Sequence, residues 1–252
     1  MIEQQIEIST ADGRMDTFVC HPERGGPFPA ILFFMDAPGI REELRDMVRR
    51  LATTGYFVLL PNLYYRAGVG ELGPIPQHEE STRRKRMFEL MAGIDVPLVA
   101  GDTVALLAYA AGSSAASAGP AGCVGYCMSG RYAVSAAHAH PDRIRAAASI
   151  HGTHLVTDRP DSIHLMAQRT NAELYFACAE IDRWAPREAV DELRRTLTGS
   201  GANAEVEFYP GVEHGFVFPQ RPAYDKPAAE RHWERLFSLF GRNLGQIPAY
   251  QA

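Results

Sequence analysis

The sequence has little cysteine and no strong excess of either charge. Its 252 residues include only four cysteines, and none of them forms a Cys-x-x-Cys pair. We therefore expect no disulfide framework and predict a reducing compartment, the cytoplasm. The net charge is −5 and charges of both signs are interspersed, so no nucleic-acid partner is expected.

Long apolar runs are missing as well. Residues 1–8 combine neither a basic start nor an apolar stretch, so we expect no signal peptide. No apolar run reaches the ~18 residues of a membrane span, and we expect no membrane partner. No helical His-x-x-x-His pair with a supporting acid is present, which predicts that no metal ion is bound.

The sequence is rich in apolar residues, and they occur in regularly spaced segments. Apolar residues make up 46% of the chain, enough for a substantial core. Asp12 and Gly13 lie between two short alternating runs, which predicts a β-hairpin over residues 5–20. Buried-type strands are expected at 30–34, 57–60, 121–126, 145–150, 174–178 and 204–209, and helices at 41–54, 82–91, 96–111, 129–138, 186–197 and 228–240.

This order predicts the fold class. A hairpin followed by alternating strands and helices indicates an α/β fold, with a mostly parallel sheet covered by helices on both faces. No internal repeat or low-complexity linker is present, so residues 1–252 are expected to form one domain. The Gly- and Pro-rich residues 66–81 are expected to form a loop that is a candidate lid.

The candidate nucleophile is Cys127, at the point where a predicted strand ends and a helix begins. A nucleophile elbow needs small residues two positions before and after the reactive side chain, and Gly125 and Ser129 meet this need. A helix N-terminus and a nearby imidazole both favour the thiolate. The alternatives are a buried structural cysteine, or Ser129 as nucleophile, although Arg131 is too large for an elbow centred there.

The candidate acid and base follow the nucleophile along the chain. Asp182 comes after a buried strand and before a helix, with Glu180 as the alternative acid. His214 lies in a turn after the last predicted strand and would accept the thiol proton or pair with the thiolate. The oxyanion would be stabilised by the backbone N–H of Met128, and the loop after residues 30–34 suggests Ala37 N–H as the second donor.

These residues resemble the dienelactone hydrolase family of α/β-hydrolases over nearly the whole chain. The resemblance is carried by Gly-Tyr-Cys-Met-Ser-Gly (125–130), Leu-Pro-Asn-Leu-Tyr-Tyr-Arg (60–66), the Asp182 segment and Glu-His-Gly-Phe (213–216). It implies a three-layer α/β-hydrolase fold and cytosolic hydrolysis of a lactone or small ester. It also implies that neither a metal ion nor an organic cofactor is needed.

The sequence departs from the family pattern at three positions. Ser129 replaces a glycine of the elbow. Asp36 stands where the family has a glutamate that takes part in activating the cysteine. Phe218 stands where family members that act on dienelactone have an arginine for the substrate carboxylate, a role for which Arg83 is one candidate here. The substrate-binding residues expected are Tyr64, Arg83, Trp184, Phe216 and Phe218.

The sequence therefore predicts a carboxylic ester or lactone hydrolase that acts through Cys127, His214 and Asp182, with Asp36 as a further catalytic residue. The partner expected is a small-molecule ester or lactone, and the oligomeric state stays open. A broad esterase or thioesterase for uncharged substrates is the alternative that Phe218 favours. A binding module without catalysis is the third reading, against which the three intact residues argue.

Overall fold

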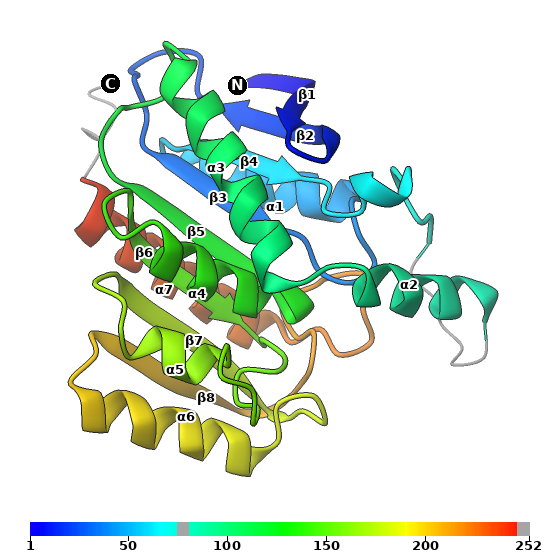
Figure 1. Cartoon of the computed structure of the whole chain (residues 1–252), viewed down its shortest axis with the longest axis vertical. Coiled ribbons are helices and arrows are strands. Elements are labelled where there is room, and N and C mark those ends of the chain that lie inside the picture. Colours follow the sequence, from blue (N-terminus) through cyan, green and yellow to red (C-terminus); the bar gives the residue numbers. More distant parts are fainter. Residues whose placement is uncertain (75–80, 246–252) are drawn as a thin grey trace. The chain divides into compact units, whose positions relative to one another are not determined.

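A computed structural model of the protein describes residues 1–74 and 81–245 (Figure 1). The chain divides into two compact units, Met1–Ala118 and Gly119–Ala252. The sequence prediction of one domain over the whole chain stays a prediction.

The first unit contains the predicted hairpin and one pair of parallel strands. Its strands follow the order β1-β2-β4-β3, with β1 and β2 antiparallel, β2 and β4 antiparallel, and β3 and β4 parallel. The strands are β1 (Ile2–Thr10), β2 (Gly13–His21), β3 (Ala30–Phe34) and β4 (Phe57–Pro61). The helices are α1 (Glu42–Thr53), α2 (Thr82–Ala92) and α3 (Val96–Gly112), with a 3-10 turn η1 at Tyr65–Ala67.

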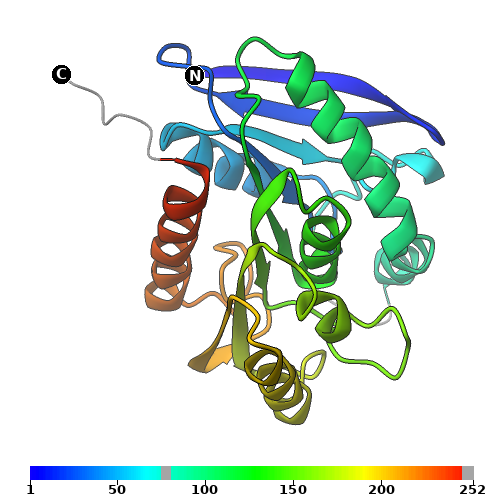
Figure 2. The same cartoon turned by 60° about the vertical axis from the view of Figure 1, so that its left-hand side comes forward.

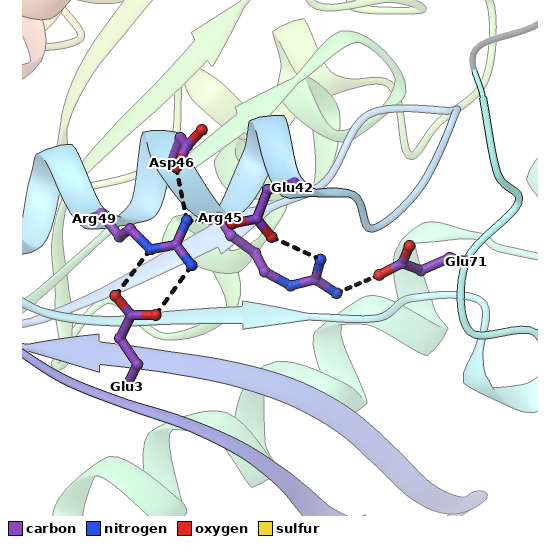
Figure 3. Close-up of polar contacts among 6 residues, drawn as sticks. All are labelled: Glu3, Glu42, Arg45, Asp46, Arg49 and Glu71. Atoms are coloured by element: carbon purple, nitrogen blue, oxygen red, sulfur yellow. Dashed lines mark hydrogen bonds and ion pairs between the residues drawn. The ribbon is translucent and has the colours of Figure 1, made fainter.

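Helix α1 has one apolar and one charged face. Leu44, Val48 and Leu51 are fully buried at helical spacing. On the polar side, Arg49 donates to both carboxylate oxygens of Glu3 in β1, at 2.9 and 3.0 Å (Figure 3). Arg45 is likewise paired with Glu42 and Glu71. Because these pairs are partly exposed, they contribute little to stability individually.

A buried ion pair holds η1 against α3. Asp102 is fully buried in α3. Its carboxylate accepts two hydrogen bonds from the Arg66 guanidinium, at 2.9 and 2.8 Å, and one from the Tyr65 hydroxyl at 2.8 Å. The charge of Asp102 is thus fully compensated, and η1 is fixed after the end of β4.

The second unit contains four parallel strands in the order β5-β6-β7-β8. The strands are β5 (Ala121–Tyr126), β6 (Ile144–Ile150), β7 (Glu173–Ile181) and β8 (Ala204–Glu213). The helices are α4 (Gly130–Ala139), α5 (Ile163–Ala167), α6 (Arg187–Ser200) and α7 (Lys226–Leu244). Helices α4 and α7 pack on opposite faces of β5 and β6 (Figure 2). Since all four strands are parallel, their carboxyl ends lie along one edge.

The α/β class predicted from the sequence is confirmed, and the differences are local. The sequence does not predict α5, because five helical residues give no readable periodicity. Strands β7 and β8 extend three and four residues beyond their predicted ends, to Ile181 and Glu213. Of the loop predicted at 66–81, η1 occupies the start, and residues 75–80 lie outside the described residues.

Within residues 1–74 and 81–245, no single helix is long and apolar enough to cross a membrane. Helices α2 and α3 would suffice only as a pair, and they are bent by 79° relative to each other. The predicted cytoplasmic location stays a prediction.

Replacing Asp102 by alanine should lower the free energy of unfolding by about 3 kcal/mol, because Arg66 and Tyr65 would lose their buried partner. Urea unfolding followed by circular dichroism measures this effect. The control is Asp46→Ala. The side chain of Asp46 is 70% exposed and pairs with Arg49, so its removal should lower the free energy of unfolding by less than about 1 kcal/mol. Equal losses in the two variants would contradict a structural role for the Asp102 pair.

Candidate active site

Cys127 directly follows strand β5, in a turn that most residues avoid. Its φ is +54°, and the chain passes through a 3-10 turn η2 (Cys127–Ser129) into helix α4. Positive φ is uncommon for a residue with a side chain and is found in strained functional turns. The strand–turn–helix arrangement predicted around Cys127 is therefore present, with a tight 3-10 turn where the sequence predicts the start of a helix.

Gly125 is what allows this turn to close. A Cβ atom at this position would lie 1.9 Å from the carbonyl oxygen of Ser129 and 2.5 Å from its carbonyl carbon. These are backbone atoms, so no side-chain rotation could relieve the overlap. Position 125 must be glycine for the turn to bring Cys127 to the start of α4.

Asp182 and His214 are joined by a short hydrogen bond. Asp182 follows β7 and His214 follows β8, and these neighbouring strands are paired up to Ile181 and Glu213. Nδ1 of His214 lies 2.6 Å from Oδ2 of Asp182, and the carboxylate accepts a second hydrogen bond, at 2.8 Å, from the backbone N–H of Trp184. The carboxylate of Asp182 is fixed at both oxygens and can orient the imidazole.

Glu180, the alternative acid, is engaged elsewhere. Its side chain is exposed, and Oε2 accepts a hydrogen bond from the backbone N–H of Gly211 at 2.7 Å. Glu180 thus fastens the turn in β8, while Asp182 contacts His214.

The surroundings of His214 favour its protonated form. Burial by itself lowers the pKa of this ring, but the negative charge of Cys127, together with the hydrogen bond to Asp182 and the charge of Asp182, raises the pKa to about 10. Nε2 of His214 is buried and makes no well-aligned hydrogen bond among the described residues. Such bonds are often loose before substrate binds. The neighbouring Asp182 and Cys127 thus stabilise the charged form of the His214 ring.

The other predicted residues of the second unit lie around this pair. Met128 is buried in η2, where its N–H is at the start of the helix. Phe216 and Phe218 are fully buried and contact the ring of His151 at 5.8 and 5.5 Å, so they form a layer of rings next to His214. Trp184 is 38% exposed beneath the guanidinium of Arg183. The predicted contacts of these residues with substrate stay predictions.

The predicted residues of the first unit have defined partners within that unit. Asp36 is fully buried and accepts hydrogen bonds from the Arg41 guanidinium at 2.5 and 3.2 Å. The carbonyl of Ala37 accepts a hydrogen bond from the Tyr64 hydroxyl at 2.7 Å. Arg83 is exposed and donates to the carbonyl of Pro74 at 3.3 Å. Their predicted roles in the reaction stay predictions.

The sequence did not single out His151, which the structure places against His214. Their ring centroids are 4.7 Å apart. The available signal was its position directly after the strand predicted at 145–150, which the structure shows as β6. Among the described residues, no three His, Cys, Asp or Glu side chains are grouped to hold a metal ion.

Known proteins with the same fold carry related names. A provisionally named dienelactone hydrolase from Klebsiella pneumoniae superposes with a TM-score of 0.85 at 24% identity, covering 96% of this chain and 98% of that one. Provisionally named carboxymethylenebutenolidases from Methylorubrum extorquens and Escherichia coli K12 are 29% and 27% identical. These two alignments cover 95% of this chain and 81% and 86% of the respective relatives.

The fold is therefore that of the α/β-hydrolases, with Cys127 in the turn between β5 and α4. The sequence model of the dienelactone hydrolase family matches residues 15–244. The chain belongs to the dienelactone hydrolase family, and it is a hydrolase of that type.

The substitution Gly125→Ala should disrupt the elbow, because the added Cβ cannot be placed within 1.9 Å of the Ser129 carbonyl oxygen. We expect a melting temperature lower by several degrees and loss of the rapid reaction of Cys127 with iodoacetamide. The control is Gly199→Ala in α6, where a Cβ meets nothing within 4 Å and helix propensity should add about 0.5–1 kcal/mol. Unchanged alkylation of Cys127 in Gly125→Ala would contradict this account of the turn.

Proposed function

We propose that this protein hydrolyses a lactone or small carboxylic ester through a Cys127–His214–Asp182 triad and an acyl-enzyme. The observation that carries the proposal is the 2.6 Å hydrogen bond between Asp182 and a partly buried His214 whose pKa is raised by Cys127 and Asp182. A histidine with these two neighbours keeps its proton in the neutral range and leaves the sulfur as the nucleophile.

The first step is attack of the Cys127 sulfur on the carbonyl carbon of the substrate. A C–S bond forms, and the carbonyl electrons move to oxygen to give a tetrahedral oxyanion. In the second unit, the N–H of Met128 at the start of η2 is a suitable donor to this oxyanion. Because Cys127 is already held in a strained turn at the strand end, little reorganisation is needed for the attack.

The second step breaks the ester bond. As the oxyanion collapses, the C–O bond to the leaving alkoxide breaks, and His214 transfers its proton to that oxygen. In a lactone, the alkoxide remains attached to the acyl group because the ring has opened. The product of this step is a thioester on Cys127 and a neutral imidazole on His214.

The last step hydrolyses the thioester. Neutral His214 takes a proton from water, the resulting hydroxide attacks the acyl carbon, and the C–S bond breaks to release the carboxylic acid product. Cys127 is restored as a thiolate and His214 as an imidazolium. Asp182 keeps the imidazole of His214 in one tautomer throughout, with the proton on Nδ1 donated to Oδ2 of Asp182.

The substrate class has two candidates. The names of the relatives support a carboxylated lactone. A neutral ester is favoured by Phe218, which is fully buried four residues after His214 and presents no charge of its own to a carboxylate. The same triad serves both.

Hydrolysis of cis-dienelactone and p-nitrophenyl acetate by the wild type and by Cys127→Ala tests this function. We expect kcat/KM in the variant to fall by at least about 10³-fold for any substrate that the wild type turns over, since no nucleophile remains. Mass spectrometry of the wild type should show the transient acyl adduct on Cys127. Turnover that survives in Cys127→Ala would contradict the proposal, and turnover of p-nitrophenyl acetate alone would select the neutral-ester class.

The pH dependence of kcat/KM tests the pairing of His214. Because the pKa is raised to about 10, the imidazolium is present below that value and is lost as the pH rises through it, so activity should fall on the alkaline side near pH 10. In Asp182→Asn the imidazolium loses a stabilising charge. We therefore expect the alkaline limb to move to lower pH by one unit or more, and kcat/KM at neutral pH to fall on the order of 10³-fold.

The matched control is Glu180→Gln, two residues away and bound only to Gly211 among the described contacts. Its alkaline limb should coincide with that of the wild type. A limb that stays in place in Asp182→Asn would show that Asp182 does not act on His214.

A further inference from the structure

His151 holds the same position after β6 that Cys127 holds after β5. Tyr126 and Ile150 are register partners in the two neighbouring strands, so the residues that follow them lie at adjacent strand ends. The backbone N–H of His151 donates to the carbonyl of Ala177 in β7 at 2.7 Å. Two residues later, the N–H of Thr153 donates to the carbonyl of Cys127 at 3.1 Å. The turn is thus fastened both to the nucleophile and to the strand that precedes Asp182.

The backbone of this turn is strained in the same way as the elbow. Within residues 1–74 and 81–245, only three non-glycine residues have positive φ: Cys127 at 54°, His151 at 37° and His154 at 54°. Such conformations persist only where the surrounding structure enforces them, and they concentrate at active sites. Two of the three lie in the turn after β6.

The ring of His151 is fully buried and fixed by other rings. It lies 5.8 and 5.5 Å from Phe216 and Phe218, and 6.1 Å from Tyr126, between ring centroids. On its remaining side it meets His214 at 4.7 Å and an interplanar angle of 66°. A ring held in this way has little freedom to rotate and limits the orientations open to the ring of His214.

His151 does not act on His214 through a side-chain hydrogen bond or through a positive charge. Neither Nδ1 nor Nε2 has a hydrogen-bond partner among the described residues. Burial, followed by the charges of His214 and Arg221, lowers the pKa of His151 well below its ordinary value, so the ring is neutral. What remains is the contact between the two rings.

We propose that His151 is a positioning residue for His214: its fixed ring holds the imidazole of His214 in the orientation in which Nδ1 lies against Asp182 and Nε2 can serve Cys127 as the base. The inference rests on the proposed role of His214 as the base. It extends the active site to the turn after β6, which holds the backbone of the nucleophile through Thr153 and the ring of the base through His151.

Two substitutions at position 151 distinguish the effect of a flat aromatic ring from the effect of filling the same space. His151→Leu fills the space without a ring, and His151→Phe keeps a ring and removes two unpartnered nitrogens. The readouts are the pKa of His214, from ¹⁵N NMR of the labelled imidazole, and the alkaline limb of kcat/KM. His138→Leu is the control, since His138 lies in α4 and also has an unpartnered ring nitrogen.

In His151→Leu we expect the pKa of His214 to fall from about 10 by one unit or more, because a misoriented ring loses its contacts with Cys127 and Asp182. The kcat/KM should fall about 10-fold or more. His151→Phe should keep both values and raise the melting temperature, and His138→Leu should leave the pKa of His214 unchanged.

A pKa that stays in place or rises in His151→Leu would overturn the proposal, even if activity fell, because that pattern indicates a purely structural role. A His151→Phe variant that folds and behaves like His151→Leu would overturn it as well. If His151→Phe does not fold, the comparison of His151→Leu with the wild type still decides. The NMR titration needs no substrate, so a wild type without esterase activity would refute the proposed function and leave this test intact.

Discussion

The close approach of Gly125 to the Ser129 carbonyl is the constraint on which the site depends. With only a hydrogen atom at position 125, the chain can turn from β5 into α4 within three residues, and Cys127 is left at the strand end with a positive φ. Cys127 then lies in the turn that directly precedes the start of α4, the end of a helix that favours negative charge. The position of Cys127 between strand and helix therefore follows from one missing side chain.

Two adjacent histidines in the second unit have pKa values shifted in opposite directions. His214 has an anionic partner on either side, so its pKa rises although burial opposes the charge. His151 is fully buried among aromatic rings, and burial together with the charges of His214 and Arg221 lowers its pKa. A positive charge on His151, whose ring centroid lies 4.7 Å from that of His214, would repel a charge on His214, and burial with the charges of His214 and Arg221 disfavours it.

In the first unit, buried charges are likewise paired with a charge of opposite sign. Asp36 and Asp102 are both fully buried, and each is compensated by an arginine, Arg41 and Arg66 respectively. The exposed pairs of Arg45 and Arg49 on α1 are more numerous and individually less important, because water screens them (Figure 3). Asp36, shorter than the family glutamate, is thus a buried carboxylate with a fixed cationic partner.

The sequence by itself determined the α/β class, the elements and the residues that follow the strand ends, because these depend on local periodicity, turn-forming glycines and chain order. It narrowed the acid to Asp182 or Glu180, and the register of β7 with β8 decided which of them meets His214, since a strand three residues longer places Asp182 at its end. The role suggested for His151 also came from the tertiary structure. Its contact with His214 joins residues 63 positions apart, and only the pairing of parallel strands brings their ends together.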